Sequence, residues 1–268
     1  MPKHQTTMRI KLTLNHLPNS TLPINYSYLL SSMIYKMLEK ANPEFSKWLH
    51  EQGWGHDGKR YKLFTFGQLS PTYFRIKGDR IILVESPTYL TISFMMDEAL
   101  GHFIEGLFNA QKFSLGDSKS HVDFEVSSVD ILPKISFSER MKFTLKTPLV
   151  ISHQGPNDRY AQYLHPVHDQ PQYSQLFFAN LLKKYIAYNG GLHNDIDLRP
   201  NDSHLKVLTK PSSKLISIKS ETQQASKIRG YTYGFEVTGT PELIKMGYYA
   251  GFGEKGSMGF GYADLWTD

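Results

Sequence analysis

Apolar and polar residues alternate along several short stretches in the first half of the chain, which is the pattern of half-buried strands. Residues 28–38 and 95–109 instead repeat apolar residues at helical spacing. Asn42-Pro43-Glu44 is a helix-starting signal, so another short helix is predicted from there to residue 50. The predicted strands are 8–14, 61–66, 73–77, 80–85, 89–94 and 122–131, with Gly78-Asp79 as a hairpin turn after residue 77.

The second half shows the same kinds of pattern. Apolar residues at helical spacing predict a helix over residues 173–188, and Thr240-Pro241-Glu242 marks the start of another that runs to residue 248. Residues 154–172 are polar and rich in His and Pro, so we expect a long loop there. Strands are predicted at 135–144, at 204–210 and 216–220 as one interrupted strand, at 228–237 and at 259–266.

Each half, in chain order, has the pattern β-α-β-β-α-β, which is typical of a ferredoxin-like domain. Two such halves account for the length of 268 residues. The predicted fold is therefore α+β, with two tandem ferredoxin-like domains built on antiparallel sheets. The first domain is placed at residues 8–130, with the catalytic residues, and the second at residues 131–268, with a glycine-rich loop.

This glycine-rich loop is residues 251–261, where five glycines fall within eleven residues. Glycine loses more backbone freedom on folding than any other residue, so such density indicates positive φ angles or a close approach to another group. Lys255 lies in the middle of the segment. A loop that presents backbone N–H groups together with a lysine is suited to binding phosphate.

Nucleotide cofactors do not fit this loop. Residues 251–256 match the pattern GxGxxG, but that pattern indicates a dinucleotide site only after a strand and at the start of a helix. Here a predicted helix precedes the loop and a predicted strand follows it. The spacing of a Walker A loop is also present, yet Ser257 stands where its lysine is required. Two interpretations remain: a site for nucleic-acid phosphates, or a helix-to-strand turn packed by Phe252 and Phe260.

Composition agrees with a nucleic-acid partner and excludes other classes. The chain has 30 Lys and Arg against 25 Asp and Glu, a formal charge of +5, and 13% aromatic residues, which suits a surface that binds RNA or DNA. It has no cysteine, so disulfides, thiolate zinc sites and cysteine nucleophiles are excluded. Neither a signal peptide nor a run of about 18 apolar residues is found, so we expect a soluble cytoplasmic protein without a membrane partner.

The glycine-rich loop also has an internal repeat. Two Gly-Phe-Gly triplets, at 251–253 and 259–261, are separated by five residues and preceded by the sequence Lys-Met-Gly-Tyr-Tyr-Ala at 245–250. Together with the two ferredoxin-like halves, this segment resembles the RAMP superfamily of CRISPR-associated proteins. Within it the chain is similar, from residue 8 to residue 265, to the Cas-six type. The resemblance implies an endoribonuclease that cuts precursor CRISPR RNA within each repeat.

Three residues of the first half match the catalytic set of that type. Tyr35 ends the pattern Leu-Leu-Ser-Ser-Met-Ile-Tyr, His50 follows Trp-Leu, and Lys62 opens Lys-Leu-Phe-Thr-Phe. The resemblance implies that these residues form a metal-independent site like that of ribonuclease A, without a cofactor. It also implies cleavage by the ribose 2′-hydroxyl, which leaves a 2′,3′-cyclic phosphate and a 5′-hydroxyl.

The residue types suit that chemistry. Histidine titrates near neutrality and can act as base or acid, a lysine ammonium can stabilise charge on the phosphorane, and a tyrosine hydroxyl can orient the nucleophile. Each residue also has a structural alternative: Tyr35 as core, His50 as a helix-end residue and Lys62 as an edge-strand lysine. His56 is the substitute if His50 is structural.

Basic residues of the second half are candidates for holding RNA rather than cutting it. On the predicted hairpin they form either a solvated face or a grip on phosphates. His165-Pro166-Val167-His168-Asp169 has the spacing of metal ligands, but a mobile polar loop is the preferred interpretation. The RNA-binding candidates are Lys210, Lys214, Lys219, Lys227 and Arg229, with Gly251, Gly253, Lys255, Gly256, Gly259 and Gly261 of the glycine-rich loop.

Three functions compete at this point. The leading one is an endoribonuclease that matures CRISPR RNA, with CRISPR repeat RNA as its partner. The second is a non-catalytic RAMP subunit that binds CRISPR RNA within an effector complex, and the presence of His50 argues against it. The third is a general RNA-binding module. Effector-complex subunits and a second copy of the chain are further partners that the resemblance allows.

Overall fold

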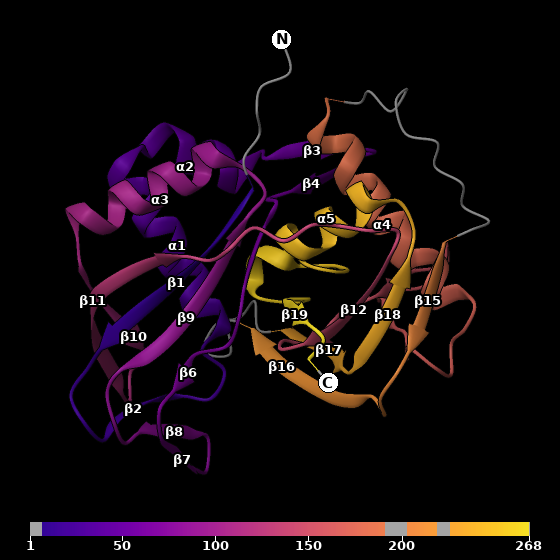
Figure 1. Cartoon of the computed structure of the whole chain (residues 1–268). Helices are drawn as coiled ribbons and strands as arrows, with labels where there is room; N and C mark the ends of the chain where they lie inside the picture. The colour runs from indigo at the N-terminus through magenta and orange to yellow at the C-terminus, as the bar shows by residue number, and fades with distance from the viewer. Residues whose placement is uncertain (1–6, 191–202, 219–225, 268) are drawn as a thin grey trace. The chain divides into compact units, whose positions relative to one another are not determined.

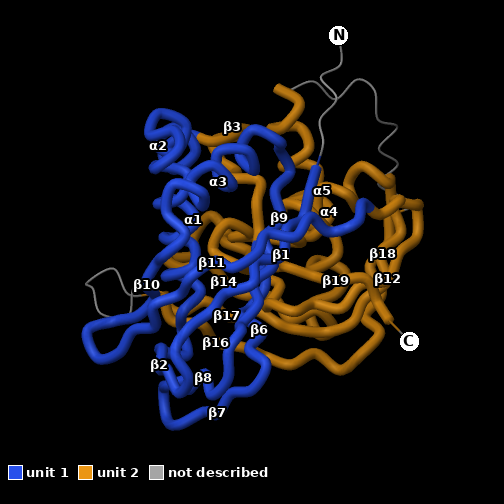
Figure 2. The backbone as a smooth tube through the Cα atoms, turned by 60° about the vertical axis from the view of Figure 1, so that its left-hand side comes forward, with its two compact units in different colours: residues 1–52, 66–134 blue, residues 53–65, 135–268 orange. Residues whose placement is uncertain are grey.

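The computed structural model describes residues 7–190, 203–218 and 226–267 (Figure 1). The chain forms two compact units: unit 1 contains residues 1–52 and 66–134, and unit 2 contains residues 53–65 and 135–268 (Figure 2). The predicted division after residue 130 lies near the third change of unit, which follows residue 134. It did not anticipate that residues 53–65, which include Lys62, group with the second half of the chain.

An antiparallel sheet is the framework of unit 1. β1 (Met8–Asn15) lies between β9 (Thr88–Phe94) and β11 (His121–Ile131). β10 (Lys112–Gly116) pairs with β11, and β6 (Ser70–Pro71) pairs with β9. On β1 the alternate residues Ile10, Leu12 and Leu14 are fully buried, because successive side chains of a strand point to opposite faces. This burial confirms the period-two pattern of the sequence.

Helices α1 (Ser27–Ala41), α2 (Pro43–Glu51) and α3 (Asp97–Asn109) gather on one side of that sheet (Figure 1). The predicted start of α2 is confirmed, since the Asn42 side-chain oxygen accepts a hydrogen bond from Phe45 N at 3.0 Å and Pro43 opens the helix. α1 and α3 approach closely at Gly106, where any Cβ would collide with the backbone of Met37. The predicted hairpin is also present, as β7 (Phe74–Lys77) and β8 (Arg80–Leu83), and β2 (Ser20–Pro23) pairs with β8.

Unit 2 has its own antiparallel sheet, in the order β15 (His204–Val207), β18 (Gly234–Thr238), β12 (Arg140–Leu145) and β19 (Ala263–Leu265). Its helices are α4 (Gln172–Tyr188) and α5 (Pro241–Ala250). The first strand, β12, lies between the third and the last, as β1 does in unit 1. The α+β class with antiparallel sheets is thus confirmed, and both units are consistent with ferredoxin-like domains.

Short hairpins complete unit 2. β3 (Trp54–His56) pairs with β4 (Lys59–Tyr61), β13 (Ser152–His153) with β14 (Gln162–Tyr163), and β16 (Ser212–Ile218) with β17 (Ser226–Thr232). A 3-10 turn, η2 (Gly256–Met258), lies within the glycine-rich loop.

Four strand predictions in these regions were wrong in part. Residues 61–66 are broken between β4 and β5 (Phe64–Phe66). Residues 204–220 and 228–237 are each divided between strands of different sheets, because hydrophobic alternation does not encode the pairing partner. The strand predicted from residue 135 begins only at Arg140.

Aromatic residues fill the centre of unit 2. Phe252 of the glycine-rich loop is fully buried, with its ring centroid 5.1 Å from those of Phe143 and Phe235. It also stacks on Phe177 of α4, at 5.9 Å between centroids. The loop is therefore anchored in the core by its first phenylalanine. Among the described residues, no helix is both long and apolar enough to cross a membrane.

Candidate functional site

Tyr35 and His50 form an aromatic pair in unit 1. Their ring centroids are 5.1 Å apart and the ring planes meet at 84°. Tyr35 lies on α1 and His50 near the end of α2, and Asn42 both ends the first helix and caps the second. Ser46 Oγ donates a hydrogen bond to the backbone oxygen of Tyr35 at 3.1 Å, which holds the two helices together. The structure thus brings together two of the three predicted catalytic residues.

The exposure of this pair differs from that of its neighbours. Ile34 and Leu38 on α1 are fully buried, whereas Tyr35 is half-buried and His50 is exposed. Tyr35 is therefore not simply a core residue. An imidazole at the surface, in T-shaped contact with a tyrosine ring, is accessible to solvent and to a bound ligand.

Lys62 belongs to unit 2. It lies in the break between β4 and β5, next to Leu63, which has a φ of 50°. The β3–β4 hairpin folds back so that Lys62 lies against Gly53, where a Cβ would be 3.2 Å from the Lys62 Cδ. Lys62 is therefore not a member of a regular strand, and the edge-strand alternative does not apply to it.

The environment of Lys62 alters its acidity. Burial, and to a lesser degree the positive charge of Arg60, lower the pKa of the Lys62 ammonium to about 8. Such a group is still mainly protonated at neutral pH, but it gives up its proton far more readily than a solvated lysine does. It can both stabilise negative charge and take part in proton transfer.

Lys62 lines a pocket of about 370 Å³ within unit 2, between β4, α4 and the glycine-rich loop. Glu254 is the one acidic residue of its lining, and its carboxylate accepts hydrogen bonds from Ser152 N at 2.7 Å and from Ser152 Oγ at 2.9 Å. Positive charge therefore dominates, which suits an anionic ligand. The basic residues of the lining are Lys59, Arg60, Lys62, Lys184 and Lys255.

The glycine-rich loop is a tightly packed turn. Gly261 has a φ of 69°, and a Cβ there would collide with the backbone oxygen of Phe252. Phe252 and Phe260 are both buried, as the turn interpretation predicts. The expectation of a row of N–H groups open to phosphate was wrong for much of the loop, because a buried turn satisfies its own polar groups. Within the protein, carbonyl oxygens accept from the N–H groups of Phe252, Glu254, Met258, Gly259, Phe260 and Gly261.

Lys255 is the exposed cation of this loop. It has a φ of 60° and precedes the turn of residues 256–258. The glycines predicted to bind RNA are buried, so their visible role is to shape the turn; their contact with RNA stays a prediction. These glycines are Gly251, Gly253, Gly256, Gly259 and Gly261.

Lys184 was missed in the sequence. It lies on α4 with only 4% of its surface exposed, and its ammonium donates to the carbonyl oxygens of Gly251 at 2.7 Å and Gly253 at 2.6 Å. Burial lowers its pKa to about 7, opposed by the charge of Glu254. The available signal was helical spacing: Lys184 follows Phe177 and Leu181 on the buried side of the helix.

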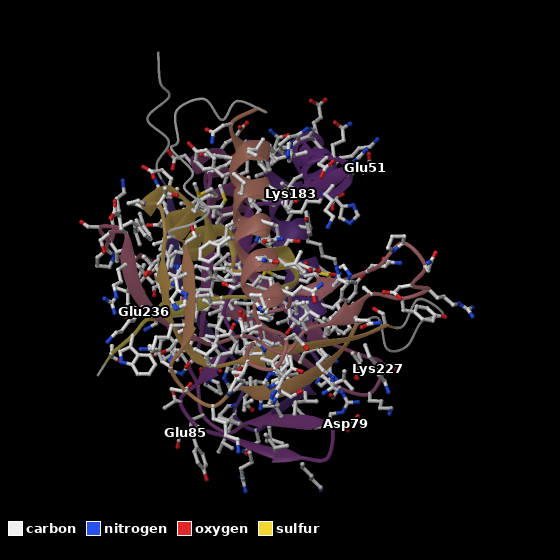
Figure 3. The ribbon with its side chains drawn as sticks, turned by 90° about the vertical axis from the view of Figure 1, so that its right-hand side faces the viewer. Glu51, Asp79, Glu85, Lys183, Lys227 and Glu236 are labelled. Carbon is white, nitrogen blue, oxygen red and sulfur yellow. The ribbon has the colours of Figure 1, made fainter. Side chains whose placement is uncertain are left out.

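His56, the substitute for His50, lies in β3 within unit 2, whereas His50 pairs with Tyr35 in unit 1. The turn beside it is tethered to α4 by an ion pair between Lys183 Nζ and Asp57 Oδ2 at 2.7 Å. Lys183 is labelled on α4 in Figure 3. The hydrogen bond and charge of Lys183 lower the pKa of the Asp57 carboxyl. This contact gives the β3–β4 hairpin a structural anchor.

The basic residues predicted to cluster on β16 and β17 do not share one face. Lys227 and Arg229 are exposed on the same face of β17, and Lys227 is labelled in Figure 3. Lys214 is opposite Gly230 and so lies on the other face, because side chains alternate along a strand. Lys210 precedes β16, and Lys219 lies outside the described residues.

The histidines of residues 165–168 are used within their own turn. His165 Nδ1 accepts from the N–H groups of Val167 and His168, at 3.1 Å each, and the Asp169 carboxylate accepts from His165 N. His165 Nδ1 is therefore occupied by hydrogen bonds of its own turn. Across residues 7–190, 203–218 and 226–267, no group of three or more His, Asp or Glu is placed to hold a metal ion.

Comparison with known proteins gives consistent matches over both halves. Residues 21–130 match the model of "CRISPR-associated protein Cas6, N-terminal", and residues 132–265 match that of "CRISPR associated protein Cas6, C-terminal". Among curated proteins, the chain is 31% identical over 258 residues to CRISPR-associated endoribonuclease Cas6 1 of Methanocaldococcus jannaschii, covering 95% of this chain and 91% of that protein. It is 25% identical over 246 residues to CRISPR-associated endoribonuclease Cas6 of Pyrococcus furiosus, covering 90% and 82%.

Solved structures agree with the sequence matches. A Cas6-related protein from Pyrococcus furiosus superposes with a TM-score of 0.81 at 25% identity, covering 98% of this chain and 100% of that one. A structure described as CRISPR associated protein Cas6 gives a TM-score of 0.74 at 29% identity, with coverage of 98% and 100%. These likenesses extend over nearly the whole chain.

Proposed function

Because the chain belongs to the Cas6 family of CRISPR-associated proteins, we propose that it is an endoribonuclease that cleaves CRISPR precursor RNA within its repeats. The observation that carries this proposal is the 31% identity, over 95% of the chain, to a protein named as such an endoribonuclease. CRISPR repeat RNA is accordingly its proposed partner, and the net charge of +5 is compatible with an RNA ligand.

The proposed reaction is an internal transesterification. The ribose 2′-oxygen loses its proton and bonds to the adjacent phosphorus, while the bond from phosphorus to the 5′-oxygen breaks and that oxygen gains a proton. The products are a 2′,3′-cyclic phosphate and a 5′-hydroxyl. Since the RNA supplies the nucleophile and the protein supplies the proton transfers, the reaction needs neither a metal ion nor a cofactor.

In this proposal Tyr35, His50 and Lys62 each take part in the cleavage. The exposed imidazole of His50 transfers the proton, and its edge contact with the Tyr35 ring supports a role for the tyrosine hydroxyl in orienting the 2′-oxygen. The ammonium of Lys62 stabilises the charge that develops on the phosphorane oxygens. What supports Lys62 is its place in a basic pocket together with its lowered pKa.

Cleavage of repeat RNA in the presence of EDTA tests the proposal. We expect wild-type protein to cut once per repeat and to leave a cyclic phosphate, and His50→Ala to bind the RNA but to cut it at least about a hundredfold more slowly. His56→Ala is the matched control, because it removes the alternative histidine, and we expect it to cut like wild type. Loss of cleavage in His56→Ala but not in His50→Ala would show that His56 of the β3–β4 hairpin, and not His50, transfers the proton.

The alternative function is a non-catalytic RAMP subunit that holds CRISPR RNA in an effector complex. Its signature in the same experiment is wild-type protein that binds repeat RNA tightly and does not cut it, with or without a divalent metal ion. Under that outcome the Tyr35–His50 pair is structural and the basic pocket serves binding alone.

A further inference from the structure

Lys184 places a charged group in the interior of unit 2. Removing an ammonium from water costs several kcal/mol unless hydrogen bonds replace its hydration. Here two backbone carbonyl oxygens replace it, those of Gly251 and Gly253, at 2.7 Å and 2.6 Å. A leucine or methionine at this position of α4 would fill the space without that cost. Lys184 is therefore better explained by the two hydrogen bonds that it donates to the loop than by hydrophobic packing.

The two carbonyls mark the start of the glycine-rich loop. Gly251 is the residue that ends α5, and Gly253 follows it at the second glycine of the first triplet. A cation at the C-terminus of a helix also interacts favourably with the helix dipole. By binding both oxygens, the ammonium of Lys184 fixes the direction in which the chain leaves α5.

That direction determines where the exposed part of the loop lies. Lys255 comes two residues after Gly253, and Gly256 packs so closely on the Ala250 carbonyl that no side chain fits there. The Lys184 side chain lines the same pocket as Lys62 and Lys255. Buried Lys184 thus binds the backbone at the start of the loop, and exposed Lys255 lies two residues further along the same loop.

The charges around Lys184 are few and identifiable. Glu254 is the acidic residue that faces it, and its carboxylate is held by Ser152 of β13. Lys59 and Arg60 of β4, Lys62 of the β4–β5 break and Lys255 of the loop contribute positive charge to the same pocket. An anion that enters the pocket would offset the repulsion among these cations.

We propose that Lys184 is a positioning residue for RNA: it clamps the carbonyl oxygens of Gly251 and Gly253 and thereby sets the glycine-rich loop for phosphate contact by Lys255. This inference rests on the proposed function, since it needs RNA as the ligand. Lys184 does not touch the RNA. It acts through the loop, so its loss changes how tightly RNA is held rather than how fast bound RNA is cut.

Lys184→Met and Lys183→Met make a matched pair. Both remove one lysine from adjacent positions of α4, but the Lys183 ammonium pairs with Asp57 at the surface, whereas the loop carbonyls accept from Lys184. The rate constant of the first turnover is measured as a function of RNA concentration, with RNA in excess over protein. For Lys184→Met we expect the half-saturating RNA concentration to rise by about tenfold or more, with the rate at saturation close to wild type. Lys183→Met leaves the clamp on the loop intact, so it should keep the wild-type half-saturating concentration. Any change in its rate at saturation would reflect loss of the anchor of the β3–β4 hairpin.

The two parameters separate positioning from mere stability. A variant that only folds less completely gives fewer active molecules and an unchanged half-saturating concentration. That result for Lys184→Met, with wild type active, overturns this inference and leaves the proposed function standing. Wild-type protein that neither binds nor cuts repeat RNA overturns both.

A measurement on wild-type protein covers the case in which Lys184→Met does not fold. With lysine labelled at the side-chain nitrogen, we expect the Lys184 ammonium to give an NMR signal protected from exchange with water, and this signal to shift when repeat RNA is added. Shifts of the Lys62 and Lys255 signals without a shift of the Lys184 signal would contradict the proposal.

Discussion

Three lysines of one pocket differ in how deeply they lie, and the depth of each determines its chemistry. Lys184 is buried and its pKa falls to about 7, while Lys62 is half-buried and its pKa falls to about 8. Lys255 is exposed. Burial disfavours the charged form of a lysine, so the same side chain can serve as an internal clamp, a tuned catalytic group or a solvated phosphate contact.

The lowered pKa of Lys62 predicts a pH dependence of cleavage. The ammonium predominates below its folded-state pKa of about 8 and is lost as the pH rises through that value, so its stabilisation of the phosphorane should fade there. Lys62→Arg keeps its charge throughout, so its rate should not show this decline. Rates at RNA concentrations well below saturation report on the free protein, and measuring them between about pH 6 and about pH 9.5 tests this prediction. If the rate of Lys62→Arg declines with pH as much as that of wild type, the decline is caused by the titration of another group.

At the scale of elements, the glycine-rich loop depends on steric limits more than on φ alone. Gly261 and Gly58 have nearly the same φ, 69° and 70°, but a Cβ at Gly261 would collide with Phe252, whereas a Cβ at Gly58 meets nothing within 4 Å. Alanine at either position costs about 1–2 kcal/mol for the left-handed backbone. The collision adds roughly 1–3 kcal/mol at Gly261.

Gly261→Ala should therefore lower the free energy of unfolding clearly more than Gly58→Ala does. Urea unfolding of the two variants beside wild type measures the difference. Equal losses would mean that the loop relaxes around the added methyl group and is less tightly packed than its contacts indicate.

Local signals in the sequence predicted most elements, and non-local contacts explain the failures. The cap of α2 depends on Asn42 and its near neighbours, so it could be predicted. The end of β17 at Thr232 and the start of β18 at Gly234 could not, because a side chain at Gly234 would collide with Trp266 on a distant segment. Lys184 was missed for a similar reason, since a lysine on a helix is ordinarily solvated.

For the molecule as a whole, the excess of positive charge predicts a strong salt dependence of RNA binding. Each phosphate contact that is lost should reduce the slope of log affinity against log salt concentration by roughly 0.7 for single-stranded RNA. Lys255→Ala should show that reduction. Lys119→Ala removes the same charge from an exposed position in unit 1, outside the basic pocket, and should leave the slope unchanged. Equal slopes for all three proteins would exclude Lys255 from phosphate contact.

The grouping of residues 53–65 with the second half also bears on the order in which the protein is made and folded. This segment leaves the ribosome early, but its partners in unit 2 are translated late. Thr65 Oγ1 donates to the Phe260 carbonyl oxygen at 3.2 Å, and Asp57 forms its ion pair with Lys183. Domains fold as units during synthesis, so this hairpin remains without its native contacts while most of the chain is translated. Lys62 reaches its final environment only after residues 254–258 of the glycine-rich loop have been added, so a chain that stops before them lacks the pocket in which the pKa of Lys62 is lowered.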